Sequence, residues 1–136
     1  MANEYSRRWF DSFLETIPDD WTANEVAGII HRLPLPAFRK ALDVCCGPGR
    51  HAGPLAAAGY EIVGVDRDPE AIAEAVRRVP AATFRITDQR DLASLDGRFD
   101  AAVILWQSFG YFDSTTNDQI LGDLARTAPV RRSTPP

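Results

Sequence analysis

From residue 41 onward, short apolar runs alternate along the chain with stretches of helical periodicity. The apolar runs at 41–45, 61–66, 82–86 and 99–105 have the length and composition of strands. Strands that alternate with helices form βαβ units around a parallel sheet. The pattern therefore predicts an α/β fold. Within the last run, residues 101–105 are apolar on both faces, which is typical of a central parallel strand.

Residues that favour helix ends separate these strands. A helix is predicted near 50–58, with Gly59 closing it. The next helix opens with Asp68 as N-cap and Pro69 at its first position. A last helix is expected from Thr115 or Thr116 to about residue 126.

Two further helices are predicted before the first strand. An amphipathic helix ending before Pro18 is indicated by apolar residues at helical spacing. These residues are Trp9, Phe10, Phe13, Leu14 and Ile17. Thr22 and Glu25 have the spacing of a capping box, so a second helix is expected from there to about Leu33.

Composition narrows the class of protein and of partner. The 136 residues, 45% hydrophobic and 25% charged, are average for a soluble domain. A net charge of −4 argues against a nucleic-acid-binding face, so a small molecule or a protein is the expected partner. Because no signal sequence or apolar run of about 20 residues occurs and the two cysteines are adjacent, a cytoplasmic protein without membrane contact is expected.

The strongest chemical signal is a glycine loop between the first strand and the next helix. Gly47 and Gly49 allow close approach of the backbone to a ligand, and the helix start offers free N–H donors. Asp66 follows Gly47 by 19 residues, at the end of the next strand, where a carboxylate can accept both ribose hydroxyls. The series Gly47-x-Gly49-x-x-Ala52 also fits a dinucleotide fingerprint, so an NAD enzyme stays open at this point.

Four motifs extend this signal. They are Leu42-Asp43-Val44-Cys45-Cys46-Gly47-Pro48-Gly49-Arg50-His51, Val63-Gly64-Val65-Asp66, Asp88-Gln89-Arg90-Asp91-Leu92, and Phe99-Asp100-Ala101-Ala102 running into Gln107-Ser108-Phe109-Gly110-Tyr111. In order and spacing they resemble class I S-adenosylmethionine-dependent methyltransferases. The resemblance implies a Rossmann-like three-layer sandwich with a mainly parallel sheet of strand order 3-2-1-4.

The resemblance also implies cofactor-binding residues for S-adenosylmethionine in the first half of the site. Asp43, Gly47 and Gly49 would meet the methionine end of the cofactor, with Cys45 in the same loop. Asp66 would accept the ribose hydroxyls. An acidic residue such as Asp43 inside the first strand is unusual for a dinucleotide fold, which disfavours the NAD alternative.

Further residues would complete the cofactor site by the same resemblance. Asp88 would accept from the adenine amino group, with Gln89 and Arg90 beside it, and Arg67 would cover the adenine face. Gln107 would face the sulfonium.

From the N-terminal helix, Tyr5, Trp9 and Phe13 would close over the cofactor, although ordinary helix packing explains them equally well. The resemblance names no general base. His51 and the cysteine pair are expected to pack rather than to react.

The resemblance covers roughly residues 40–126 and stops before the family's fifth strand, so the usual C-terminal strands are expected to be lacking. The chain is divided into an N-terminal helical segment at 1–39 that caps the cofactor site, a cofactor-binding core at 40–126 and an irregular tail at 127–136. In this order the fourth strand becomes an exposed edge, which predicts a homodimer formed by edge pairing or segment exchange. Methyl transfer to a small molecule is the expected function, and a non-catalytic S-adenosylmethionine-binding homodimer is the alternative.

Overall fold

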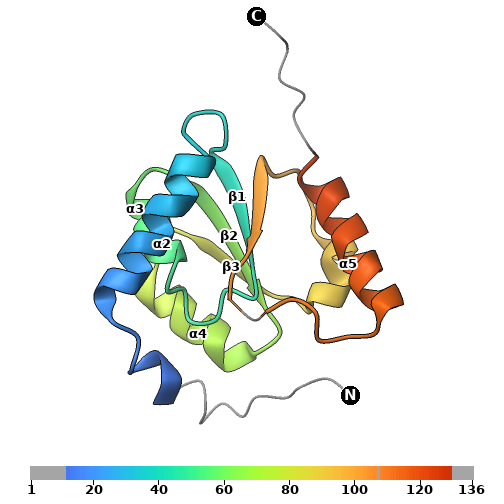
Figure 1. The fold of residues 1–136 in the computed structure, drawn as a ribbon, viewed down its shortest axis with the longest axis horizontal. Coiled ribbons are helices and arrows are strands. Elements are labelled where there is room, and N and C mark those ends of the chain that lie inside the picture. Colours follow the sequence, from blue (N-terminus) through green and yellow to red (C-terminus); the bar gives the residue numbers. More distant parts are fainter. Residues whose placement is uncertain (1–11, 107, 130–136) are drawn as a thin grey trace, which may run out of the picture.

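A computed structural model describes residues 12–106 and 108–129 of the chain. Its centre is a four-stranded parallel sheet with the strand order β3-β2-β1-β4, as predicted (Figure 1). The strands are β1 (Lys40–Val44), β2 (Glu61–Asp66), β3 (Thr83–Ile86) and β4 (Ala101–Ile104). Because all of them run in one direction, their carboxyl ends meet at one edge of the sheet, which is where ligands bind in open α/β folds.

Helices cover both faces of the sheet. The helices α2 (Asp19–Arg32), α3 (Ala52–Ala57) and α4 (Pro69–Arg78) lie on one side of it, and α5 (Ser114–Thr127) lies on the other (Figure 1). The 3₁₀ helix η1 (Gln89–Ser94) packs against α5. The result is the three-layer α/β sandwich that the sequence predicts. No helix in the described part of the chain is long and apolar enough to cross a membrane.

Alternate residues of β1 pack into two separate apolar clusters, one on each face of the sheet. Ala41 joins the cluster beneath α2 and α3, whereas Leu42 and Val44 join the cluster beneath α5 and η1. This is the two-residue period of a strand buried on both faces. By the same period Asp43 belongs to the α2–α3 face, and it is only 2% exposed.

Most helix boundaries agree with the sequence signals. Asp68 caps α4 by accepting a hydrogen bond from the Glu70 N–H, and Pro69 is the first helical residue. Gly59 has a φ of 106°, the left-handed conformation that follows many helix ends. Of the predicted first helix, residues 12–14 are helical and the earlier part lies outside the described residues.

The predicted capping box is wrong. Helix α2 starts at Asp19, and its N-cap is Pro18, which makes no side-chain capping bond. Two aspartates in the first turn, Asp19 and Asp20, favour this earlier start because they complement the helix dipole. Thr22 and Glu25 therefore lie inside the helix, where their side chains are free for tertiary contacts.

Two further expectations at the C-terminal end need correction. Strand β4 lies at the edge of the described sheet, as the predicted strand order implied and contrary to the central place that its apolar run indicated, and only Ala101 among its residues is buried. Thr127, placed in the tail by the sequence, ends α5: its hydroxyl donates to the Asp123 carbonyl and its carbonyl accepts from the Phe99 N–H. These bonds tie the end of α5 to the start of β4.

Candidate functional site

The glycine loop after β1 has an unusual backbone. Cys45, Gly47 and Gly49 have φ values of 59°, 54° and 87°, so three of five consecutive residues are left-handed. A Cβ on Gly47 would meet nothing within 4 Å, whereas a Cβ on Gly49 would lie 3.2 Å from Val79. Gly47 thus leaves open space beside the backbone, and Gly49 allows the segment after α4 to pack closely.

Asp66 joins this loop to the end of β2. Its Oδ2 accepts from the Gly47 N–H at 2.9 Å, and its Oδ1 accepts from the Asp68 N–H at 2.9 Å. Burial raises the pKa of Asp66 above its usual value, and the two backbone bonds oppose that rise. Since a carboxylate can accept about four hydrogen bonds, two acceptor positions remain for a ligand with paired hydroxyls.

Asp43 is a buried carboxyl group beneath the loop. Its Oδ2 has no hydrogen-bond partner among the described residues. Burial, with the charge of Asp66 as a smaller cause, raises the pKa of Asp43 to about 7, and Arg50 opposes the shift. Buried acceptors without a partner are rare in folded proteins, so this oxygen fits a donor or cation supplied by a ligand.

Asp88 follows β3, at the predicted adenine position, but it already has a partner. It caps η1 by accepting from the Arg90 N–H, and its two oxygens accept from the Arg90 guanidinium at 2.9 and 2.8 Å. This guanidinium holds the pKa of Asp88 below its usual value and stacks 4.7 Å from the centre of the Phe112 ring. Arg90 is thus a partner of Asp88, and an adenine amino group would have to share that carboxylate with it.

The other predicted adenine residues lie near the same edge. Gln89 donates from Nε2 to the Ser108 carbonyl at 3.1 Å, which links the segments after β3 and β4. Its Oε1 is a second buried acceptor without a partner in the described part of the chain. Arg67 is exposed, and its charge opposes the rise in the pKa of Asp66 and contributes to the lowered pKa of Asp88. Three of the predicted residues, Tyr5, Trp9 and Gln107, lie outside the described residues.

The two cysteines and the histidine of the loop region are packed into the protein interior to different degrees. Burial raises the pKa of Cys45 to about 12, and it raises the pKa of Cys46 further. Both therefore stay as thiols at neutral pH and lack the thiolate character of nucleophiles. His51 is buried, and its Nε2 lies 3.0 Å from Glu25 Oε2.

A polar cluster that joins α2 to this edge of the sheet was not predicted from the sequence. Besides His51, Glu25 binds the Arg50 guanidinium and the Trp106 indole N–H. These partners come from segments that are 25, 26 and 81 residues away in the chain. No local spacing could have indicated the cluster, because its members meet only in the folded sheet.

A comparison with known protein families identifies the family to which this chain belongs. Residues 41–128 match the family model described as a methyltransferase domain. The chain belongs to this methyltransferase family. Among its relatives, the chain is 33% identical over 115 residues to the protein named methyltransferase YqeM of Bacillus subtilis (strain 168). It is 37% identical over 95 residues to trans-aconitate 2-methyltransferase of Methylobacterium nodulans.

The chain spans less than half the length of these two relatives. The match to YqeM covers 82% of this chain and 44% of that protein, and the match to the trans-aconitate enzyme covers 64% and 36%. The match to the family model, over residues 41–128, includes the glycine loop and all of the four strands except the first residue of β1.

Solved structures show the same fold. DesVI of Streptomyces venezuelae matches with a TM-score of 0.70 at 25% identity, over 91% of this chain and 53% of that one. Magnesium protoporphyrin IX methyltransferase (ChlM) from Synechocystis PCC 6803 with bound SAM matches with a TM-score of 0.66 at 24% identity, over 82% and 54%. S-adenosylmethionine is the cofactor of this family, and the fold is the Rossmann-like class I methyltransferase fold. No cluster of metal-ligating side chains occurs in the described ranges 12–106 and 108–129.

Proposed function

We propose that this chain binds S-adenosylmethionine at the glycine loop and transfers its methyl group to a small molecule. The observation that carries the proposal is the loop itself. Gly47 is left-handed with open space beside it, and the carboxylates of Asp43 and Asp66 flank it from two adjacent strands. This arrangement offers open space beside the backbone and side-chain acceptors for an ammonium and a ribose, while the N–H groups of Gly47 and Gly49 already donate to Asp66 and to the Cys46 carbonyl.

The described residues fit the parts of this cofactor. The loop around Gly47 and Gly49 would hold the methionine end, and the unpartnered Oδ2 of Asp43 would compensate positive charge there. Asp66 would accept the ribose hydroxyls with the acceptor positions that its two backbone bonds leave free. Asp88 and Gln89 would lie beside the adenine. The buried Oε1 of Gln89 has no partner among the described residues and could accept a hydrogen bond there.

The cofactor supplies an activated methyl carbon on a sulfonium, so the protein has to contribute position and water exclusion. Carboxylates already held by backbone bonds, such as Asp66, lose little freedom when a ligand binds. We assign no general base, since displacement at an already activated methyl carbon can proceed through positioning and desolvation alone.

A small-molecule acceptor is supported by the kind of relatives that match. One is the trans-aconitate enzyme, and another is an N,N-dimethyltransferase of Streptomyces venezuelae named for an amino-sugar nucleotide, 30% identical over 93 residues. The acceptor side of the site would lie beyond β4, beside Trp106 and Phe112.

Turnover tests this proposal directly. The protein is incubated with S-adenosylmethionine and pools of small carboxylic acids, amines and phenols, and S-adenosylhomocysteine is quantified. Acceptor-dependent product that disappears in Asp66→Ala supports methyl transfer. Saturable cofactor binding without product from any pool would instead favour the second candidate, a non-catalytic cofactor-binding homodimer.

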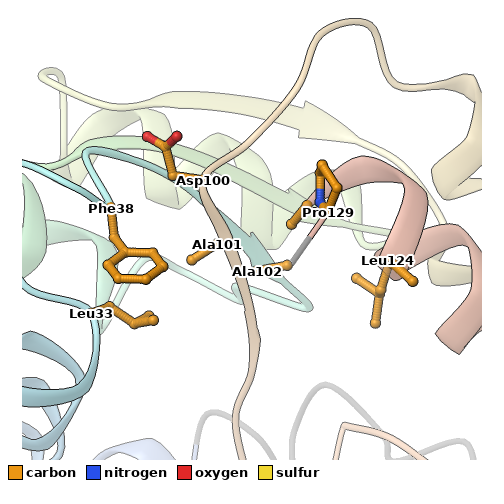
Figure 2. A pocket seen from close by; sticks show the side chains of 9 residues that line it. Leu33, Phe38, Asp100, Ala101, Ala102, Leu124 and Pro129 are labelled. Carbon is orange, nitrogen blue, oxygen red and sulfur yellow. The ribbon is translucent and has the colours of Figure 1, made fainter. Parts of the chain in front are cut away.

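The observation behind this second candidate is the outer edge of β4, which pairs with no second strand among the described residues. An apolar groove of about 380 Å³ runs along it, between the Leu33–Phe38 segment and the end of α5 (Figure 2). Ala101 and Ala102 form its floor. We propose that a second copy of this chain covers the groove, because two identical edges can pair antiparallel about a two-fold axis.

Light scattering at micromolar concentration tests the dimer. The wild type is expected at twice the chain mass, and Ala102→Glu is expected at the chain mass because it places a charge in the paired edge. Val76→Glu, at a 53% exposed position of α4, serves as the control and is expected to stay dimeric. A monomeric wild type would refute this arrangement.

A further inference from the structure

Glu25 binds three side chains that belong to different parts of the site. Its Oε2 accepts from the Trp106 indole N–H at 2.6 Å and lies 3.0 Å from His51 Nε2, and its Oε1 accepts from Arg50 Nη1 at 3.3 Å. Arg50 and His51 follow the glycine loop directly, whereas Trp106 lies just after β4. One carboxylate on α2 thus connects the segment after the glycine loop, where the cofactor would bind, to the segment after β4, where the methyl acceptor would bind.

The Arg50 guanidinium is fixed from several directions. Besides Glu25, it donates to the Thr22 hydroxyl at 2.8 Å, and it stacks 4.6 Å from the centre of the Trp106 ring. Its side chain is only 17% exposed. A guanidinium held this firmly presents its charge from one defined place rather than from a mobile side chain in solvent.

Trp106 is held in a conformation that it would not adopt by itself. Its φ is 59°, which is left-handed and unfavourable for a bulky residue. Phe13 contacts its ring edge-on at 5.4 Å between centroids, and Trp21 lies 6.3 Å away. Among the described residues, the Glu25 carboxylate is the acceptor for the indole N–H, so Glu25 stabilises the turn after β4.

The cluster is also balanced in charge. Burial is the largest single effect and would raise the pKa of Glu25, but the bonds to Trp106 and His51 and the charge of Arg50 together lower it. Burial, the largest cause, lowers the pKa of His51, so the imidazole is neutral at pH 7.5. One negative carboxylate then compensates one positive guanidinium immediately after the glycine loop.

We propose that Glu25 is a positioning residue that neutralises Arg50 beside the cofactor and fixes Trp106 at the entrance to the acceptor side. This inference rests on the proposed function. In S-adenosylmethionine only two methylene groups and the α-carbon separate the sulfonium from the carboxylate that the glycine loop would hold. An uncompensated Arg50 would therefore repel the sulfonium of S-adenosylmethionine but not the neutral thioether of S-adenosylhomocysteine.

The test compares the dissociation constants of the two cofactor forms by calorimetry at pH 7.5 and low salt. Glu25→Gln removes the charge while keeping the size of the side chain. We expect it to weaken S-adenosylmethionine binding about 3- to 10-fold more than S-adenosylhomocysteine binding, the size expected for one partly screened charge. Arg50→Gln leaves Glu25 uncompensated and is expected to shift the ratio in the opposite direction.

The double variant Glu25→Gln/Arg50→Gln is expected to restore the wild-type ratio, which a purely structural role for Glu25 would not produce. Asp20→Asn, an exposed carboxylate on the same helix, is the matched control and is expected to change neither constant. If Glu25→Gln does not fold, the shift in Arg50→Gln alone decides the question.

The outcomes separate the two proposals. Equal weakening of both ligands by Glu25→Gln, or no opposite shift in Arg50→Gln, would overturn the role of Glu25. A folded wild type that binds neither ligand would overturn the proposed function itself.

Discussion

The buried carboxyl group of Asp43 should make the stability of the protein depend on pH in a way that one substitution removes. Its pKa is raised from 3.8 to about 7 in the folded protein, mainly by burial. Between these two values the folded state holds a proton that the unfolded chain has released, so stability falls as the pH rises from 4 to 7. A shift of about three units corresponds to roughly 4 kcal/mol, lost in full only above pH 7.

Asp43→Asn cannot ionise and should lack this dependence. The amide places new donors in a buried position, so its absolute stability can lie above or below that of the wild type. The difference between the two proteins is the measured quantity, because other titrating groups contribute equally to both. Between pH 5 and pH 8 this difference should change by about 3 kcal/mol in favour of the variant.

Urea unfolding followed by circular dichroism at pH 5, 6, 7 and 8 measures this change. Asp20→Asn, at an exposed position of α2, is the control and should run parallel to the wild type. A constant difference between Asp43→Asn and the wild type across this range would refute the assignment of a raised pKa to Asp43.

Three further predictions concern packing and helix capping. Gly64→Ala should lower the free energy of unfolding by about 1–3 kcal/mol in urea titrations, because the new Cβ would lie 2.6 Å from the Phe84 ring. Leu42→Ala, at a fully buried position of β1, should lower it by about 2–5 kcal/mol, and an effect under 1 kcal/mol would contradict the described core. Asp113→Ala removes the N-cap bond to the Thr116 N–H and should lower the free energy of unfolding by about 1 kcal/mol, with a matching loss in thermal midpoint.

The sheet and its strand order could be predicted because they depend on local patterns and on a motif. The apolar run at 61–66 and the cap at Asp68 specify their elements within a few residues, and the structure agrees. The start of α2 could not be predicted, since the spacing of Thr22 and Glu25 imitates a capping box while both side chains bind Arg50 instead. These tertiary contacts, together with Asp19 and Asp20 in the first turn, favour the earlier start.

The candidate site divides in the same way. Gly47 and Asp66 were predicted from spacing, and the structure joins them by a hydrogen bond. The hydrogen bonds from Arg90 to the Asp88 carboxylate were not predicted, because two residues this close in sequence can form them only when the 3₁₀ turn folds. The role of Glu25 was missed for a different reason, which is that its partners come together only when the sheet edge is assembled.

Calorimetric titration with S-adenosylhomocysteine tests the central claim most directly. We expect saturable binding at one site per chain, no heat of binding with NAD, and a roughly 5- to 150-fold weaker affinity in Asp66→Ala through the unpaired ribose hydroxyls. A folded protein that binds NAD, or that binds neither ligand, would contradict a cofactor site at the glycine loop.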